Sequence, residues 1–516
     1  MTEHGKVNPW IVAIAVMFAT FMEVLDTTVV NVSLPHIAST MSATIEEATW
    51  ALTSYLVANA IILPMTGWLA GVFGRKRLLM WSTMGFTAAS LLCGLAPNLA
   101  SLVIFRIIQG ATGGALQPLS QAVLLESFKP EDRGKAMGFW GLGIVVAPIL
   151  GPVLGGWITE NYSWRWVFYI NLPVGIASLI MTQLYVFDPP YLRRETWKID
   201  YWGMGLLVVG IGTLQYVLDK GQQDDWFGST LIATLAVVAA VGLIALILRE
   251  LHTAHPIVDL FAFKDRSFAT GVFLMTVVGF VLYGSLVLLP IMLQTLLGYS
   301  AVEAGKAMAP RGVGSLIMMP IVGMLTQKVD ARKLLIVGLA IGGWTMWWLG
   351  GLNLDAGYWD IFWPQFLQGA GMALLFVPLT TVSMATIQPQ RMGNATSLFN
   401  LMRNIGGSVG IAVSGTYLQR HREVVSSVLG EHINAYDPVA QSMLSQITNG
   451  LMAAGADAVT AGQRAYAVLA GMLFRQSSMV AFVTIFRIMG VVFLLMIPLV
   501  FIMKRPKGGS APVGAH

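Results

Sequence analysis

Residues 138–156 read GFWGLGIVVAPILGPVLGG and predict a membrane-spanning helix that is bent and closely packed. Its small residues recur every four positions, so they share one ridge on which a neighbouring backbone can approach closely. Two prolines one turn apart lack amide donors and predict a bend. The ridge consists of Gly143, Ala147, Gly151 and Gly155, and the prolines are Pro148 and Pro152. We expect this helix to take part in a conformational change, although ordinary packing of a kinked helix would explain the same residues.

The composition predicts an integral membrane protein. Only 11% of the 516 residues are charged, and 56% are hydrophobic. A soluble fold this apolar would expose large apolar patches, whereas spanning helices must be apolar all round. The single cysteine, Cys93, excludes an internal disulfide and a cysteine-rich metal site. Basic residues are scattered through short loops, so the net charge of +5 indicates membrane topology and not nucleic-acid binding.

Fourteen apolar runs are long enough to cross a bilayer, which takes about 20 residues. They lie near residues 10–34, 48–73, 78–96, 100–125, 135–158, 165–187, 201–218, 229–249, 268–290, 302–326, 333–352, 360–386, 394–418 and 478–503. We therefore predict an all-α polytopic fold with six-helix bundles in residues 1–190 and 266–516 and two inserted transmembrane helices in 191–265. An even number of spans places both termini on one side. The excess of Lys and Arg in the loops of that side predicts that it is the cytoplasm.

The two groups of six spans resemble each other. Residues 64–78 align with residues 320–334 at an offset of 256, through a proline, a glycine, a basic pair and a leucine. Further along, the pair at 109–110 matches the pair at 368–369 at an offset of 259. The ridge repeats at the same offset, since Ala147, Gly151 and Gly155 map onto Gly406, Gly410 and Ser414. The sequence thus predicts a duplicated six-helix unit, an arrangement common in transporters.

Two acids and one arginine inside predicted spans are the first candidates for a functional site. Glu23 and Asp26 are three residues apart, hence on one face of the first span. Burial and a like-charged neighbour both disfavour a charged carboxylate, so such a group can take up and release a proton near neutral pH. Arg106 in the fourth span would favour the charged form of Asp26 if the two paired. The alternative is a static ion pair that holds the two spans together.

Further polar residues lie within spans. Charged side chains there are costly and usually face a cavity or a partner, and Arg311, Arg403 and Arg487 are three of them. Arg487 lies near an aromatic run and has the alternative of reaching the membrane surface. The candidates for lining a central substrate cavity are Asn31, Gln109, Gln117, Gln365, Gln368, Asn400, Arg403 and Asn404. About half of these would only bond neighbouring helices.

One loop is long. Residues 421–475 form an outer loop, in which Asp437 and Pro438 begin a predicted amphipathic helix. This helix either lies on the bilayer or protein rim or offers a docking surface. Enzymatic signals are weak: Gly406, Ser408 and Gly410 fit G-x-S-x-G only within a span, and a P-loop and a metal-ligand cluster are both missing. We expect no enzyme activity, no metal and no cofactor.

Several motifs resemble one transporter family. Residues 25–35 (LDTTVVNVSLP) and 102–110 (LVIFRIIQG) are similar to its first-span and fourth-span motifs. The GPxxGG core at Gly151, Pro152, Gly155 and Gly156 is similar to its antiporter signature. The chain thus resembles the EmrB/QacA group of fourteen-span drug:proton antiporters in the major facilitator superfamily, which implies the major facilitator fold. The resemblance implies proton-gradient-driven export of hydrophobic or amphipathic compounds, with Asp26 and Arg106 in proton transfer.

The resemblance also implies a gating loop and partners. The loop after the second span, GWLAGVFGRK, carries Gly67, Gly74, Arg75 and Lys76, but has Gly71 where the superfamily usually has an aspartate. Glu23 has no place in the family pattern. Implied partners are lipophilic substrates, protons, membrane lipid, a periplasmic EmrA-like adaptor that would contact residues 421–475, and an outer-membrane channel, with the chain in the bacterial inner membrane. The rival interpretations are a metabolite or sugar transporter of the same fold, or a membrane receptor or scaffold.

Overall fold

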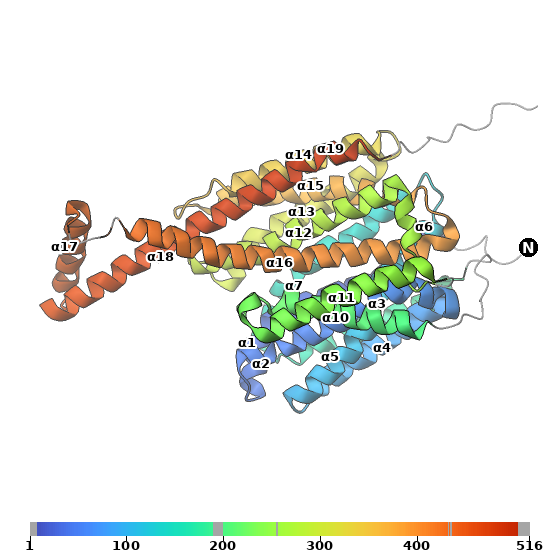
Figure 1. The fold of residues 1–516 in the computed structure, drawn as a ribbon, viewed down its shortest axis with the longest axis horizontal. Helices are drawn as coiled ribbons and strands as arrows, with labels where there is room; N and C mark the ends of the chain where they lie inside the picture. The colour runs from blue at the N-terminus through green and yellow to red at the C-terminus, as the bar shows by residue number, and fades with distance from the viewer. Residues whose placement is uncertain (1–7, 189–199, 254–255, 432, 434–435, 504–516) are drawn as a thin grey trace, which may run out of the picture.

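The computed structural model describes residues 8–188, 200–253, 256–431, 433 and 436–503, and the regular elements in these ranges are helices. Figure 1 shows an elongated bundle in which most helices run along the long axis. We call the end of the bundle at which the first helix begins the near end, and the opposite end the far end. The predicted boundary at residues 190 and 191 falls outside the described residues.

The first half contains six spans. Hydrophobic runs begin after polar caps, as where Asn8 caps the first helix and Asn98 the fifth through a capping box. The fourth span is broken at Gly113 and Gly114 into two helices. The helices are α1 (Pro9–Thr40), α2 (Ile45–Ala48), α3 (Trp50–Phe73), α4 (Arg75–Leu95), α5 (Leu99–Gly113), α6 (Leu116–Ser127), α7 (Arg133–Asn161), α8 (Trp166–Tyr169) and α9 (Asn171–Tyr185).

The second half repeats this plan after two inserted helices. Of the inserted pair, α10 (Tyr201–Lys220) packs against α3 and α16, and α11 (Thr230–His252) packs against α10. At their near ends Arg249 donates hydrogen bonds to Asp200, which lower the pKa of that carboxyl. The second half consists of α12 (Arg266–Thr295), α13 (Ala301–Leu325), α14 (Ala331–Leu349), α15 (Tyr358–Met384), α16 (Met392–Gly430), α17 (Pro438–Ala453), α18 (Ala458–Leu495) and α19 (Ile497–Val500).

Each of the fourteen predicted apolar runs lies on a helix. Within the described ranges, eleven helices are long and apolar enough to span a membrane, and the bent α7 makes twelve. The other two, α14 and α16, are less apolar, and each packs against several helices of its own half. Neighbouring helices can satisfy polar side chains that lipid could not, which is why these two tolerate them.

The predicted small-residue ridge packs within the first half. Gly143, Gly151 and Gly155 of α7 face Met17, Thr28 and Val29 of α1, so the two helices approach closely along the ridge. Ala147 is fully buried. The helix is bent by 42° between Pro148 and Leu150, as the missing proline donors lead one to expect. The ridge therefore joins α7 to α1, and other residues of α7 face the second half.

The two halves meet through α7 with α13 and α15, and through α3 and α6 with α16. The near end is tightly closed. A methyl group added at Gly138 would lie 2.8 Å from the carbonyl oxygen of Met319, and the Gln327 Nε2 donates to the carbonyl oxygen of Glu131 at 2.8 Å. Gly67 lies against Asn394 of α16 in the same way.

The segment 421–475 is not a loop, which corrects the sequence analysis. Helix α16 continues to Gly430, α18 already begins at Ala458, and α17 packs against α18, so that all three project beyond the far end (Figure 1). Loss of apolarity marks where α16 leaves the bundle, but residues 419–430 contain no proline and no glycine before Gly430 that would stop it. As predicted, α17 begins at Pro438 behind the Asp437 cap, and none of its described side chains is buried.

Candidate functional site

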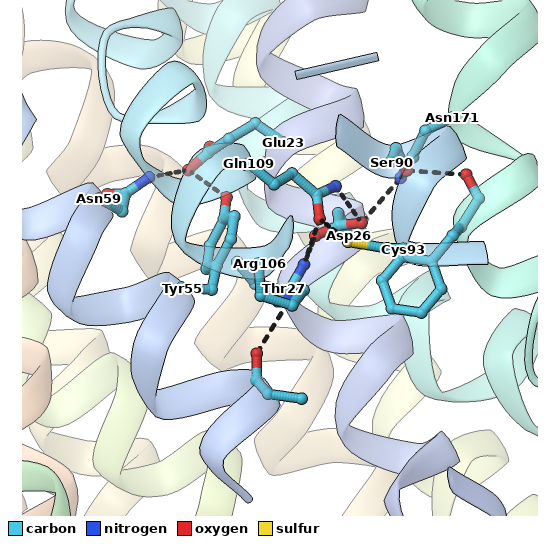
Figure 2. Close-up of polar contacts among 12 residues, drawn as sticks. Glu23, Asp26, Thr27, Tyr55, Asn59, Ser90, Cys93, Arg106, Gln109 and Asn171 are labelled. Carbon is cyan, nitrogen blue, oxygen red and sulfur yellow. Dashed lines mark hydrogen bonds and ion pairs between the residues drawn. The ribbon is translucent and has the colours of Figure 1, made fainter. Parts of the chain in front are cut away.

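A buried ion pair joins α1 to α5. The Arg106 Nη1 lies 2.6 Å from the Asp26 Oδ2, and neither side chain is exposed. The guanidinium also donates from Nε to the carbonyl oxygen of Ala51 at 2.8 Å, and it stacks over the Tyr55 ring at 4.1 Å. The predicted partner of Asp26 is therefore the one found. Figure 2 shows this pair at the centre of a polar cluster.

The second oxygen of Asp26 is satisfied by two amides. Gln109 Nε2 donates to the Asp26 Oδ1 at 3.0 Å, and Asn171 Nδ2 donates to the same oxygen at 2.7 Å (Figure 2). Asn171 also donates to the Ser90 hydroxyl at 3.0 Å, and Arg106 donates to the Gln109 Oε1 at 2.8 Å. Four helices thus contribute to the surroundings of one carboxylate, which accepts hydrogen bonds from three side chains.

Glu23 lies beside this cluster but has different partners. Its Oε1 accepts from Asn59 at 3.1 Å and from the Tyr55 hydroxyl at 3.4 Å. Its Oε2 accepts from Gln117 of α6. Glu23 is 4% exposed, so the second acid of α1 is also withdrawn from solvent. Within the described residues no arginine or lysine lies within ion-pair distance of it.

A chain of polar contacts leads from Glu23 into the second half. Gln117, which donates to Glu23, accepts from the Arg403 Nη2 of α16, and Arg403 also donates to Asn404 at 3.3 Å. One turn away Asn400 donates to the Gln121 Oε1 at 2.6 Å. Because α6 and α16 belong to different halves, these contacts must break or rearrange when the halves move relative to one another.

The other predicted cavity residues do not form one site. Gln365 donates to Gln368 at 3.2 Å within α15, and both are buried in the second half. Asn31 is exposed on α1, whereas Asn404 is half-buried. Apart from Asn31, the candidates therefore divide among the Asp26 cluster, the α6 and α16 interface, and α15. Their polarity was visible in the sequence, but their grouping depends on which helices are neighbours.

The predicted gating loop holds the near end. Arg75 pairs with Glu126 of α6 and donates to the carbonyl oxygen of Pro389 in the second half at 3.3 Å. The Lys76 amide donates to the Asp188 Oδ1 at 2.8 Å, next to Gly74, whose φ of 85° favours glycine. The contact between Arg75 and Pro389 thus links the halves, although Gly71 stands where the superfamily usually has an aspartate.

Two pockets lie away from these predicted residues. The larger, about 240 Å³, lies between α12 and α16 toward the far end, and its lining includes Gln222, Leu288, Ser414 and Arg422. A much smaller pocket, about 10 Å³, lies where α7, α12 and α13 meet. It is lined by Ile144, Val145, Pro148, Leu282, Tyr283, Leu286 and Arg311. Across the described ranges, no three His, Cys, Asp or Glu residues come together as a metal site would need.

Sequence reasoning missed Asn171, Tyr55 and Asn59 as members of the site. Asn171 follows a predicted loop in the run INLPVG, and its position inside an apolar span was a usable signal. Tyr55 and Asn59 are one turn apart on α3, but many polar residues at such spacing only bond their own helix. Contact with Glu23 distinguishes these two, and that requires the fold.

The chain has close relatives of known name. The family model described as Major Facilitator Superfamily matches residues 16–411. The chain is 39% identical over 512 residues to the "Multidrug export protein EmrB" of Escherichia coli strain K12, covering 98% of each chain. It is 42% identical over 440 residues to the protein of the same name from Haemophilus influenzae, covering 85% of this chain and 86% of that one.

The fold also matches a solved structure. The crystal structure of the human organic anion transporter MFSD10 (TETRAN) superposes with a TM-score of 0.59, covering 96% of this chain and 99% of that one. The two sequences are 13% identical, so this likeness concerns the fold alone.

Proposed function

The chain belongs to the major facilitator superfamily, and from this premise we propose that it exports hydrophobic and amphipathic compounds in exchange for protons. Its relatives named as multidrug export proteins support the export of varied compounds. The buried Asp26 and Arg106 pair is the observation that carries the proton part of the proposal. No cofactor is needed, because one charge that crosses 100 mV supplies about 2.3 kcal/mol.

The pair can exchange a proton only if its geometry changes. In this structure Asp26 accepts hydrogen bonds from Arg106, Gln109 and Asn171. Separation of α5 from α1 would remove Arg106 and leave a buried carboxylate, which then favours protonation. A substrate that binds between the halves would promote that separation, and return of the pair would release the proton.

Alternating access would open one end of the bundle and close the other. The near end is closed here by Gly138 against Met319 and by Arg75 against the second half. The bend at Pro148 gives α7 a place at which the two ends of the helix can move separately. The opening would also change the contacts of Glu23, because its link to Arg403 through Gln117 crosses the interface between the halves.

We place the chain in the bacterial inner membrane with both termini in the cytoplasm, on the excess of Lys and Arg in the near-end loops. The far end then faces the periplasm. The projecting α16, α17 and α18 would contact a periplasmic EmrA-like adaptor, which would continue the export path to an outer-membrane channel. The exposed apolar residues of this projection, Val424, Val428, Val439 and Val459 among them, support a protein contact.

The test uses proteoliposomes that hold a pH gradient and an internal pH dye. A panel of lipophilic drugs is added, and the change in internal pH is measured. Wild type should dissipate the gradient when drug is added. Asp26→Asn should not, although the protein should still insert and elute as a single species.

Asp219→Asn is the matched control, because Asp219 is an acid inside α10 that contacts Thr53 and lies outside the cluster. This variant should respond as wild type does. Drug-dependent proton release that persists in Asp26→Asn would remove Asp26 from the mechanism. No proton movement with any drug in wild type would contradict antiport itself.

A further inference from the structure

Arg311 is a buried cation without a carboxylate. It lies on α13 and is 1% exposed, and its Nη2 donates to the Ser285 hydroxyl of α12 at 2.8 Å. Its Nε and Nη1 have no hydrogen-bond partner within the described residues. Nor, in the same ranges, does any acid lie within ion-pair distance of it. A buried charge of this kind is expensive in a membrane protein, which makes it a functional candidate.

Each of the other fully buried arginines has a carboxylate within reach, which Arg311 lacks among the described residues. Arg75 has Glu126, Arg106 has Asp26, and Arg403 reaches Glu23 through the amide of Gln117. Packing in this fold therefore supplies a carboxylate to a buried arginine directly or through one amide. The absence of either arrangement at Arg311 indicates that its counter-ion comes from outside the chain.

The residues around the pocket beside Arg311 suit a ligand that carries the opposite charge. Its other walls are Ile144, Val145 and Pro148 of α7 and Leu282, Tyr283 and Leu286 of α12, so a single cation lies in an otherwise largely apolar lining. Such a lining suits a molecule with one acidic group and an apolar chain. The pocket is also shared between the halves, since α7 belongs to the first and α12 and α13 to the second.

We propose that Arg311 binds the acidic headgroup of an exported amphiphile, whose apolar chain lies along α7 and α12; the word exported rests on the proposed function above. The ligand brings the counter-ion that the protein lacks, and either Nε or Nη1 of the guanidinium can donate to a carboxylate oxygen. Because the pocket is narrow in this structure, binding separates α7 from α12 at the bend near Pro148. Occupancy thereby couples the ligand to the relative position of the halves.

The binding test uses full-length protein in phosphatidylcholine nanodiscs near neutral pH, with radiolabelled dodecanoate as the probe. Wild type should bind dodecanoate, and unlabelled dodecanol, which has the same chain and no charge, should compete poorly. Arg311→Gln should weaken dodecanoate binding about tenfold or more, and Arg311→Lys should fall between the two. Arg487→Gln is the matched control, because Arg487 is an exposed span arginine over Trp347, and it should bind as wild type does.

Two results would overturn the proposal. The first is equal dodecanoate binding by wild type and Arg311→Gln, or equal competition by dodecanol. The second is a clear fall in the unfolding temperature of ligand-free Arg311→Gln, which would mean that the cation supports the fold. We expect that temperature to be unchanged or higher, because the variant removes an unpaired buried charge.

The assay also separates this inference from the proposed function. Dodecanoate binding in nanodiscs does not require a proton gradient or transport. Arg311-dependent binding by a wild-type protein that moves no protons with any drug would uphold the binding site and contradict the antiport. Drug-dependent proton release by a wild-type protein that does not bind dodecanoate would uphold the antiport and contradict the binding site.

Discussion

The two halves of the molecule place different chemistry at equivalent positions. The offset of 259 maps Arg106 onto Gln365, and the offset of 256 maps Tyr55 onto Arg311. In the first half a carboxylate and a guanidinium lie together and neutralise each other. In the second half the guanidinium lies against a hydroxyl group and stays a net positive charge. Under the two proposals above, the first half would gain a proton, whereas the second carries a charge that a ligand would balance.

The packing of the halves, in contrast, is repeated. Gly151 and Gly155 of α7 face α1, and the equivalent Gly410 and Ser414 lie on α16, where Gly410 faces the Phe280 backbone of α12. Equivalent helix pairs therefore approach each other along equivalent ridges. The duplicated scaffold therefore shares its helix contacts between the halves, although the buried polar residues of the halves differ.

The largest expected effect is on stability, and it contrasts the two arginines. Arg106→Gln strands Asp26 as an unpaired buried acid, and we expect a loss of about 3 to 5 kcal/mol in unfolding free energy. Arg311→Gln should cause no loss, since no carboxylate is left behind. Denaturant unfolding in mixed micelles compares the two, and similar losses would erase the distinction between a paired and an unpaired cation.

A substitution of intermediate effect gives the second half a buried ion pair like that of the first half. Ser285→Asp places a carboxylate where a hydroxyl now lies 2.8 Å from Arg311. We expect a gain of about 1.5 to 3 kcal/mol in stability, the range for hydrogen bonds to charged groups. Dodecanoate binding should fall about tenfold or more, because the protein now supplies the counter-ion.

Ser285→Asn is the control for Ser285→Asp, since it has the same size without the charge. It should show neither the gain in stability nor the full loss of binding. Unchanged dodecanoate binding in Ser285→Asp would mean that the ligand does not use Arg311.

The smallest expected effect concerns the repeated ridge. A methyl group at Gly410 would lie 2.8 Å from the carbonyl carbon of Phe280, a backbone that cannot rotate away. At Gly151 the nearest neighbour is the Thr28 side chain, and the backbone carbonyl carbon of Thr28 is 3.2 Å away. We expect Gly410→Ala to lose about 1 kcal/mol more than Gly151→Ala in the same unfolding assay. A larger loss at Gly151 would mean that the ridges are not equivalent.

The sequence predicted the spans well because each apolar run must be long enough to cross lipid. It also predicted the pairing of Asp26 with Arg106, since charges in spans need partners and few were available. It could not predict that Arg311 lacks a carboxylate, because that depends on which residues of α7, α12 and α15 surround it. Proton transfer by Asp26 and the remaining site roles stay predictions.

The error at residues 421–475 has a different physical cause. Hydropathy reports where a segment leaves the apolar environment, but it does not report where the helix ends. Residues 419–430 are polar enough to leave the membrane and still good enough helix formers to continue α16. A search for stop signals, in addition to hydropathy, would have placed the helix end at Gly430.

The continuity of α16 has a mechanical consequence. Its 39 residues form one rod that carries Arg403 at the interface between the halves and ends at the projecting tip. About 40 Å of helix separate Arg403 from Gly430, so a tilt of about 10° at the interface would sweep the tip by about 7 Å. Because α18 packs beside α16 and α17 packs on α18, such a tilt would move the whole projection outside the bundle.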